Sequence, residues 1–129
     1  MPMRPIVREA RVWLPPLAMM LLIFALSSMS AGNEHHGALY VVSRKVAHFC
    51  EYAVLLALWW RALTTKMSER RALALALGIV LAYAISDEFH QTFVTGRRGR
   101  PLDVGIDMMG ALAASAVIML KRPRRRVKA

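Results

Sequence analysis

ALALALGIVLAYAISDEFHQTF, residues 72–93, is apolar up to Ile85 and then becomes abruptly polar. A helix of this length crosses the hydrocarbon core of a bilayer, which is about 30 Å thick. Asp87 and Glu88 therefore fall near one end of a predicted membrane span. A carboxylate inside a span is costly unless it is paired, hydrated or neutralised, so these residues are candidates for a functional site.

Three more stretches have the length and composition of a span. All four predicted spans lie at about residues 12–29, 40–63, 72–93 and 102–120. Pro15-Pro16 is expected in the first turn of the first span, where missing donors cost least. A cleavable signal peptide is the alternative for the N-terminus, but its apolar core would be shorter. We predict an all-α fold: one four-helix transmembrane bundle over residues 1–129, with a basic tail at 121–129.

The charge distribution predicts the orientation of this bundle. The chain is 57% hydrophobic and yet carries a formal net charge of +10, which is unusual for a soluble domain of this size. A cytoplasmic N-terminus and C-terminus place 13 of the 18 Lys and Arg residues on the inner side. We therefore expect a multi-pass protein of the bacterial inner (cytoplasmic) membrane, with the loops around His35 and Arg98 outside. The basic tail is expected to contact anionic lipid and not nucleic acid.

Polar residues of three spans are predicted to meet at the outer side. Arg44, His48 and Tyr52 recur every four residues, as do Asp103 and Asp107, so each set lies on one helical face. The short loop through Arg97 keeps that arginine close to the carboxylates. We predict an outward-facing ligand pocket formed by Arg44, Lys45, His48, Glu51, Tyr52, Asp87, Glu88, Gln91, Arg97, Asp103 and Asp107.

Two sequence blocks resemble signatures of the VanZ-like family of small bacterial integral membrane proteins. The first block is Arg44-Lys45-x-x-His48-Phe49-x-Glu51-Tyr52-x-x-Leu55. The second is Asp87-Glu88-x-x-Gln91-x-Phe93-x-x-Gly96-Arg97, followed by Asp103-x-x-x-Asp107-x-x-Gly110. Two positions differ from the pattern, Thr95 in place of proline and Asp107 in place of asparagine. The family's founding member is associated with low-level resistance to the glycopeptide teicoplanin, so the resemblance implies a link to the cell envelope.

Several functions agree with these residues. The pocket is expected to bind a lipid-linked or peptidoglycan-related ligand, with membrane lipids as partners. An enzyme is the alternative, in which Glu51 or Asp87 acts as a general base beside His48. A structural or regulatory membrane partner is a third possibility, and a transporter has the least support because four spans leave little room for alternating access. We expect no cofactor and no metal, since a set such as His48, Glu51, Asp87, His90 and Asp107 lacks a dense ligand motif. The oligomeric state is left open.

Overall fold

Four long helices make up the structure, a computed structural model that describes residues 4–30 and 37–122. In chain order they are α1 (Pro5–Ser28), α2 (Ala38–Leu63), α3 (Glu69–Gln91) and α4 (Pro101–Lys121). The described residues contain no strand. All four helices are long and apolar enough to cross a membrane. The all-helical fold and the four candidate spans are thus confirmed. His35 and the basic tail beyond Arg122 lie outside the described residues.

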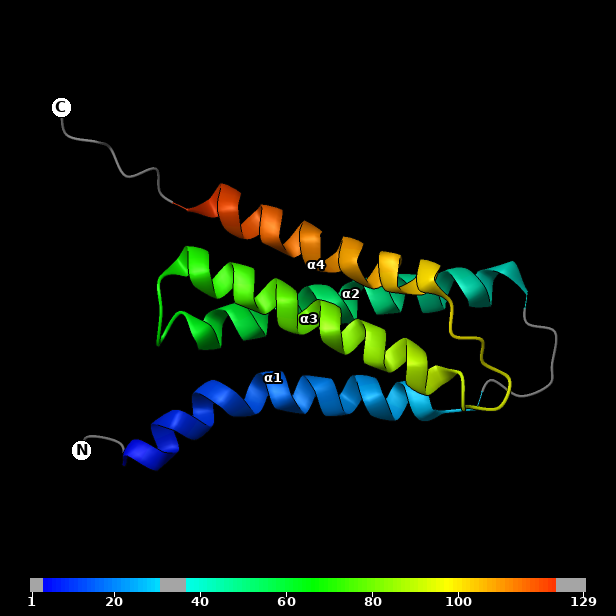
Figure 1. Ribbon diagram of the computed structural model, residues 1–129, viewed down its shortest axis with the longest axis horizontal. Coiled ribbons are helices and arrows are strands. Elements are labelled where there is room, and N and C mark those ends of the chain that lie inside the picture. The colour runs from blue at the N-terminus through cyan, green and yellow to red at the C-terminus, as the bar shows by residue number, and fades with distance from the viewer. Residues whose placement is uncertain (1–3, 31–36, 123–129) are drawn as a thin grey trace.

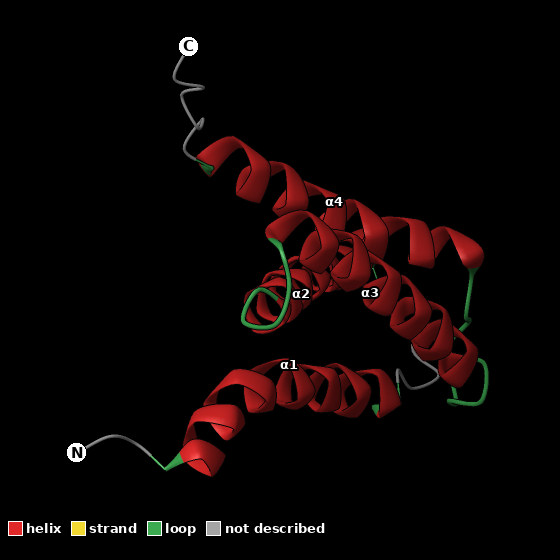
Figure 2. Cartoon of the chain, turned by 60° about the vertical axis from the view of Figure 1, so that its left-hand side comes forward, coloured by secondary structure: helices red, strands yellow, loops and turns green. Residues whose placement is uncertain are grey.

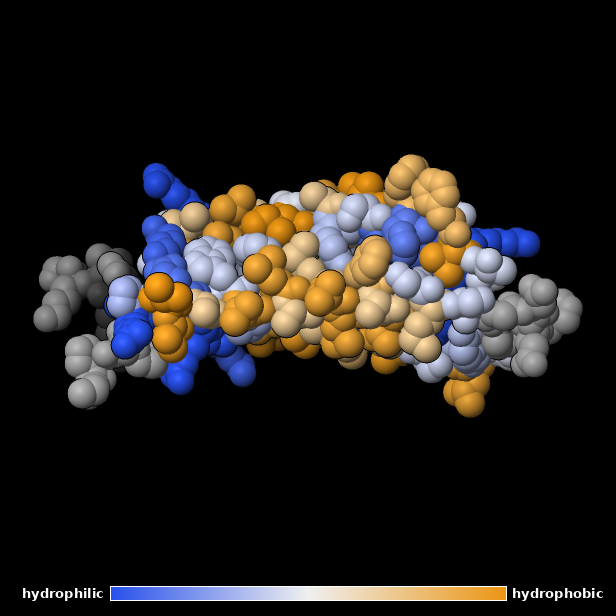
Figure 3. Space-filling model, turned by 90° about the horizontal axis from the view of Figure 1, so that it is seen from below, coloured by the Kyte–Doolittle hydropathy of each residue, from blue (hydrophilic) through white to orange (hydrophobic). Residues whose placement is uncertain are grey.

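The helices run alternately up and down. The start of α1 and the end of α4 therefore lie at the same end of the bundle (Figure 1). Hydrophobic residues dominate the middle of the surface, and hydrophilic residues gather mostly toward the two ends (Figure 3). Helix α2 packs against each of the other three helices. Within the described residues α1 does not contact α4, and the two lie on opposite sides of α2 and α3 (Figure 2).

The start of the first helix differs from the prediction. Helix α1 begins at Pro5 and not near Val12, so Pro15 and Pro16 lie inside it and not in its first turn. The additional N-terminal turns are polar, and Glu9 in these turns pairs with Lys66 at 2.8 Å. A proline inside a helix removes a main-chain donor and bends the helix, and α1 is bent along its N-terminal half (Figure 1).

Small residues on α3 allow the helices to approach closely. Ala72, Ala76, Val80 and Ala84 recur every four residues and are fully buried. The same face continues into Glu88, which is also buried. This face of α3 is thus apolar along most of its length and polar at its end. Helices α2 and α4 each have a similar face, which is polar at the start of the helix and apolar further along. As a result, the three faces enclose an apolar core at one end of the bundle and a polar region at the other.

Candidate functional site

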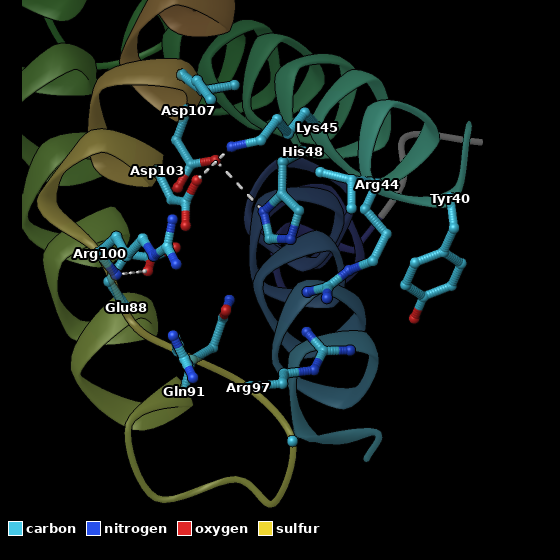
Figure 4. A pocket seen from close by; sticks show the side chains of 14 residues that line it. Tyr40, Arg44, Lys45, His48, Glu88, Gln91, Arg97, Arg100, Asp103 and Asp107 are labelled. Atoms are coloured by element: carbon cyan, nitrogen blue, oxygen red, sulfur yellow. Dashed lines mark hydrogen bonds and ion pairs between the residues drawn. The ribbon is translucent and has the colours of Figure 1, made fainter. Parts of the chain in front are cut away.

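A cavity of about 330 Å³ lies between the first turns of α2, the last turns of α3 and the first turns of α4 (Figure 4). This volume is sufficient for a small ligand or a headgroup. The lining residues are Tyr40, Val41, Arg44, Lys45, His48, Glu88, Gln91, Gly96, Arg97, Arg98, Arg100, Asp103, Ile106 and Asp107. Eight of the eleven residues predicted from the sequence are among them.

Basic residues are concentrated near the rim of the cavity. Lys45 Nζ lies 2.9 Å from Asp103 Oδ1, and both side chains are partly exposed. Asp103 also lies in the first turn of α4, where the helix dipole favours a negative charge. The Arg44 guanidinium carbon lies 5.9 Å from the centre of the Tyr40 ring. The rim thus contains one neutralised pair and further cations.

Arg97 connects the α3–α4 loop to the end of α1. Its Nε donates to the main-chain oxygen of Met29 at 2.8 Å, and its Nη2 donates to that of Leu26 at 2.9 Å. These carbonyls lie at the C-terminal end of α1, where a positive charge is favourable. Burial lowers the pKa of Arg97, and the neighbouring charge of Arg44 contributes to this lowering. The two hydrogen bonds to the carbonyls hold Arg97 close to Arg44, although both side chains carry the same charge.

The floor of the cavity contains a histidine and a buried carboxylate. Nδ1 of His48 lies 3.3 Å from Oδ1 of Asp107, although the two atoms do not have hydrogen-bond geometry. Asp107 has no exposed surface, and both of its carboxylate oxygens lack a hydrogen-bond partner. Asp107 lies six residues into α4, about 9 Å below the start of the helix. Close packing of α4 on α2 places it there, because a side chain at Gly110 would collide with the main chain of Phe49.

Glu88 forms the wall between α3 and α4. Its Oε2 accepts a hydrogen bond of 3.0 Å from the main-chain N–H of Arg100, and its buried Oε1 has no partner. Gly99 permits this approach, since a side chain there would collide with the main chain of Glu88. The loop that follows α3 is thus held against the cavity.

Asp87 does not line the cavity but is the centre of a buried network. Its Oδ2 accepts hydrogen bonds from Ser27 Oγ at 2.9 Å, from Tyr52 Oη at 3.3 Å and from Gln91 Nε2 at 3.4 Å. The donors come from α1, α2 and α3. This network joins three helices, and Gln91 connects it to the cavity.

Glu51, Tyr52 and Asp87 are the three predicted site residues that do not line the cavity. Tyr52 is fully buried, and its ring stacks near that of His48 with the centroids 6.4 Å apart. Glu51 is half-buried and lies within electrostatic reach of His48, Asp87 and Asp107. In the described part of the chain, neither Arg44 nor Arg97 forms an ion pair with Glu51.

Sequence reasoning did not include Ser27 or Arg100 in the site. Ser27 lies in the last turn of the first apolar stretch, at the same end of the bundle as Asp87. A small polar residue in such a stretch often pairs with another helix, and this signal could have identified it. Arg100 contributes its main-chain N–H to Glu88, and side-chain chemistry gives no indication of such a contact.

The geometry of the described residues does not support a metal site or a place for His90 in the cavity. Within residues 4–30 and 37–122, no group of three or more His, Cys, Asp or Glu residues is placed to hold a metal ion. His90 does not line the cavity. Instead its ring lies against that of Phe24 of α1 in a tilted arrangement, with the ring centroids 4.6 Å apart, and its Nε2 lies 3.0 Å from Ser28 Oγ.

Four apolar helices, three of which enclose a polar cavity, define a small multi-pass membrane protein. The sequence profile of the VanZ/LLP1 family matches residues 7–122, which is most of the chain. The chain belongs to this VanZ-like family, as its two sequence blocks predicted. None of the curated proteins or solved structures with which it was compared matches it.

Proposed function

We propose that this protein binds the phosphate-bearing headgroup of a cell-envelope lipid, such as a lipid-linked peptidoglycan precursor, in the cavity between α2, α3 and α4. The protein lies in the bacterial cytoplasmic membrane with both termini inside. The cavity then opens at the outer side, where envelope precursors are used. Membership of the VanZ-like family supports the link to the envelope, since the founding member of that family is associated with teicoplanin resistance.

The arrangement of Arg44 and Arg97 is the observation that carries this proposal. Their guanidinium groups lie close together beside the cavity (Figure 4). Within the described residues no carboxylate forms an ion pair with either of them, and the acceptors of Arg97 are neutral carbonyls. Two like charges held together, with no carboxylate of the described residues paired to either, favour a bound anion. Guanidinium groups suit phosphate, because they donate parallel hydrogen bonds to its oxygens.

Lipid retention measured by native mass spectrometry tests the proposal. The protein is released from nanodiscs that contain equal parts of phosphatidylethanolamine, phosphatidylcholine and phosphatidylglycerol, and its bound lipids are counted. We expect Arg44→Gln to lower total lipid retention roughly tenfold, the effect of losing one charge-assisted hydrogen bond. Arg61→Gln is the matched control, since it removes an exposed arginine from the opposite end of α2. Equal retention by Arg44→Gln and the wild-type protein would contradict the proposal.

Acid–base catalysis on the bound headgroup is a second candidate, favoured by the His48–Asp107 pair. A carboxylate beside an imidazole holds the ring in place and supports its action as a general base. The carboxylate in ion-pair contact with His48 is Asp107. A general base at Glu51 or Asp87 beside His48 stays a prediction. A change in the mass of the retained lipid, abolished by His48→Gln, would distinguish catalysis from binding alone.

A further inference from the structure

The cavity has opposite electrical character at its rim and at its floor. The rim holds Arg44, Arg97, Arg98 and Arg100, whereas the floor holds Asp107. Asp87 and Asp103 also lie within electrostatic reach of Asp107. Among the described residues on the floor, His48 is the one potential cation in contact with this carboxylate. A ligand that is negative at one end and positive at the other would match this distribution.

Asp107 lies 3.3 Å from His48 but accepts no hydrogen bond from the described residues. It is fully buried, it lines the cavity, and neither carboxylate oxygen receives a hydrogen bond. A buried carboxylate that receives no hydrogen bond is costly, so a group that supplies N–H donors and positive charge would bind there favourably. A primary ammonium supplies both, with three N–H donors on one nitrogen.

The spacing between the two ends suits a short ligand. Arg44 and His48 are four residues apart on α2, which corresponds to about 6 Å along the helix axis. A phosphate joined to an amine by a two-carbon chain spans a similar length. The phosphate would then contact the arginines while the ammonium reaches the level of His48 and Asp107.

We infer that the cavity selects a zwitterionic headgroup, in which a phosphate is joined to a primary ammonium, and that Asp107 binds the ammonium. This inference rests on the proposed function, because it assigns the phosphate to Arg44 and Arg97. It adds a selectivity that the arginines do not provide. Phosphocholine has the same charges but no N–H donor, and glycerol phosphate has hydroxyl groups but no positive charge.

The nanodiscs with equal parts of the three lipids test this selectivity in the wild-type protein. We expect phosphatidylethanolamine to be retained roughly tenfold more than either phosphatidylcholine or phosphatidylglycerol, as for a charge-assisted hydrogen bond. Free phosphoethanolamine should displace the retained lipid at lower concentration than free glycerol phosphate does, which shows that the headgroup itself is recognised. Equal retention of the three lipids, or equal displacement by the two free compounds, would overturn the inference.

A variant assigns the selectivity to Asp107. Asp107→Asn keeps the shape of the side chain and removes its charge, so we expect lipid binding to persist with the preference for ethanolamine lost. Glu69→Gln is the matched control, because it makes the same change in a carboxylate that pairs with Arg122 at the other end of the bundle. A preference that survives in Asp107→Asn would contradict the role of Asp107. Since Arg44→Gln tests phosphate binding separately, the inference can fail while the proposed function stands.

Discussion

The Ser27 hydroxyl donates to Asp87 Oδ2 at 2.9 Å, which links α1 to α3 across 60 residues of sequence. Both side chains are buried. Because Tyr52 and Gln91 donate to the same oxygen, Asp87 holds α1 and α2 against α3 at the polar end of the bundle. Asp87 therefore stabilises the frame of the cavity and does not contact the space within it.

Replacing Asp87 with leucine should destabilise the protein. Leucine branches at the same carbon but is larger and cannot accept a hydrogen bond, so the buried donors of Ser27, Tyr52 and Gln91 lose their acceptor. Each buried donor left without a partner costs about 1–3 kcal/mol, so we expect a clear fall in the thermal unfolding temperature in detergent. Glu51→Leu is the comparison, since Glu51 accepts no hydrogen bond within the described residues and lies near other carboxylates. Equal losses of stability in both variants would show that the network is not what holds α1.

Gly105 and Gly110 both lie on α4, and we expect their replacement by alanine to have opposite effects on stability. An added methyl group at Gly110 would collide with the main chain of Phe49 on α2, so Gly110→Ala must separate the two helices. We expect a loss of about 1–3 kcal/mol, as for other overpacked contacts. Gly105 has no neighbour within 4 Å of the added atom, and Gly105→Ala should be neutral or stabilising. Unfolding temperatures of the two variants, measured side by side, check both expectations.

The orientation of the bundle can be measured by labelling in whole cells. Cys50 is exposed, so the test begins from Cys50→Ser. Arg98→Cys lies in the loop between α3 and α4, and Ser68→Cys lies immediately before α3 at the opposite end. We expect an impermeant thiol reagent to label position 98 and not position 68, because 13 of 18 basic residues favour cytoplasmic termini. The reverse pattern would mean that the cavity opens to the cytoplasmic side, and it would remove the basis for an envelope ligand.

Sequence patterns predicted the later spans more accurately than the first. Helix α3 covers residues 69–91 against a prediction of 72–93, and its polar end lies where Ser86 interrupts the apolar run. Helix α1 extends further toward the N-terminus than predicted, because its first turns are charged and hydropathy does not reveal a helix that continues outside the apolar run. Glu9 in these turns pairs with Lys66, which is far away in the sequence, so the N-terminal residues by themselves do not predict this contact.

The sequence determined that four helices are long and apolar enough to cross a membrane and that the polar residues gather at one end, since length, hydropathy and helical periodicity are local properties. Only the tertiary structure decided the partners of these residues. Asp107 pairs with His48, Asp87 turns toward Ser27, and Arg97 binds the end of α1. These choices depend on how each helix is rotated about its axis. That rotation is set by contacts between distant residues, such as the close approach of Gly110 to Phe49, which no single stretch of sequence contains.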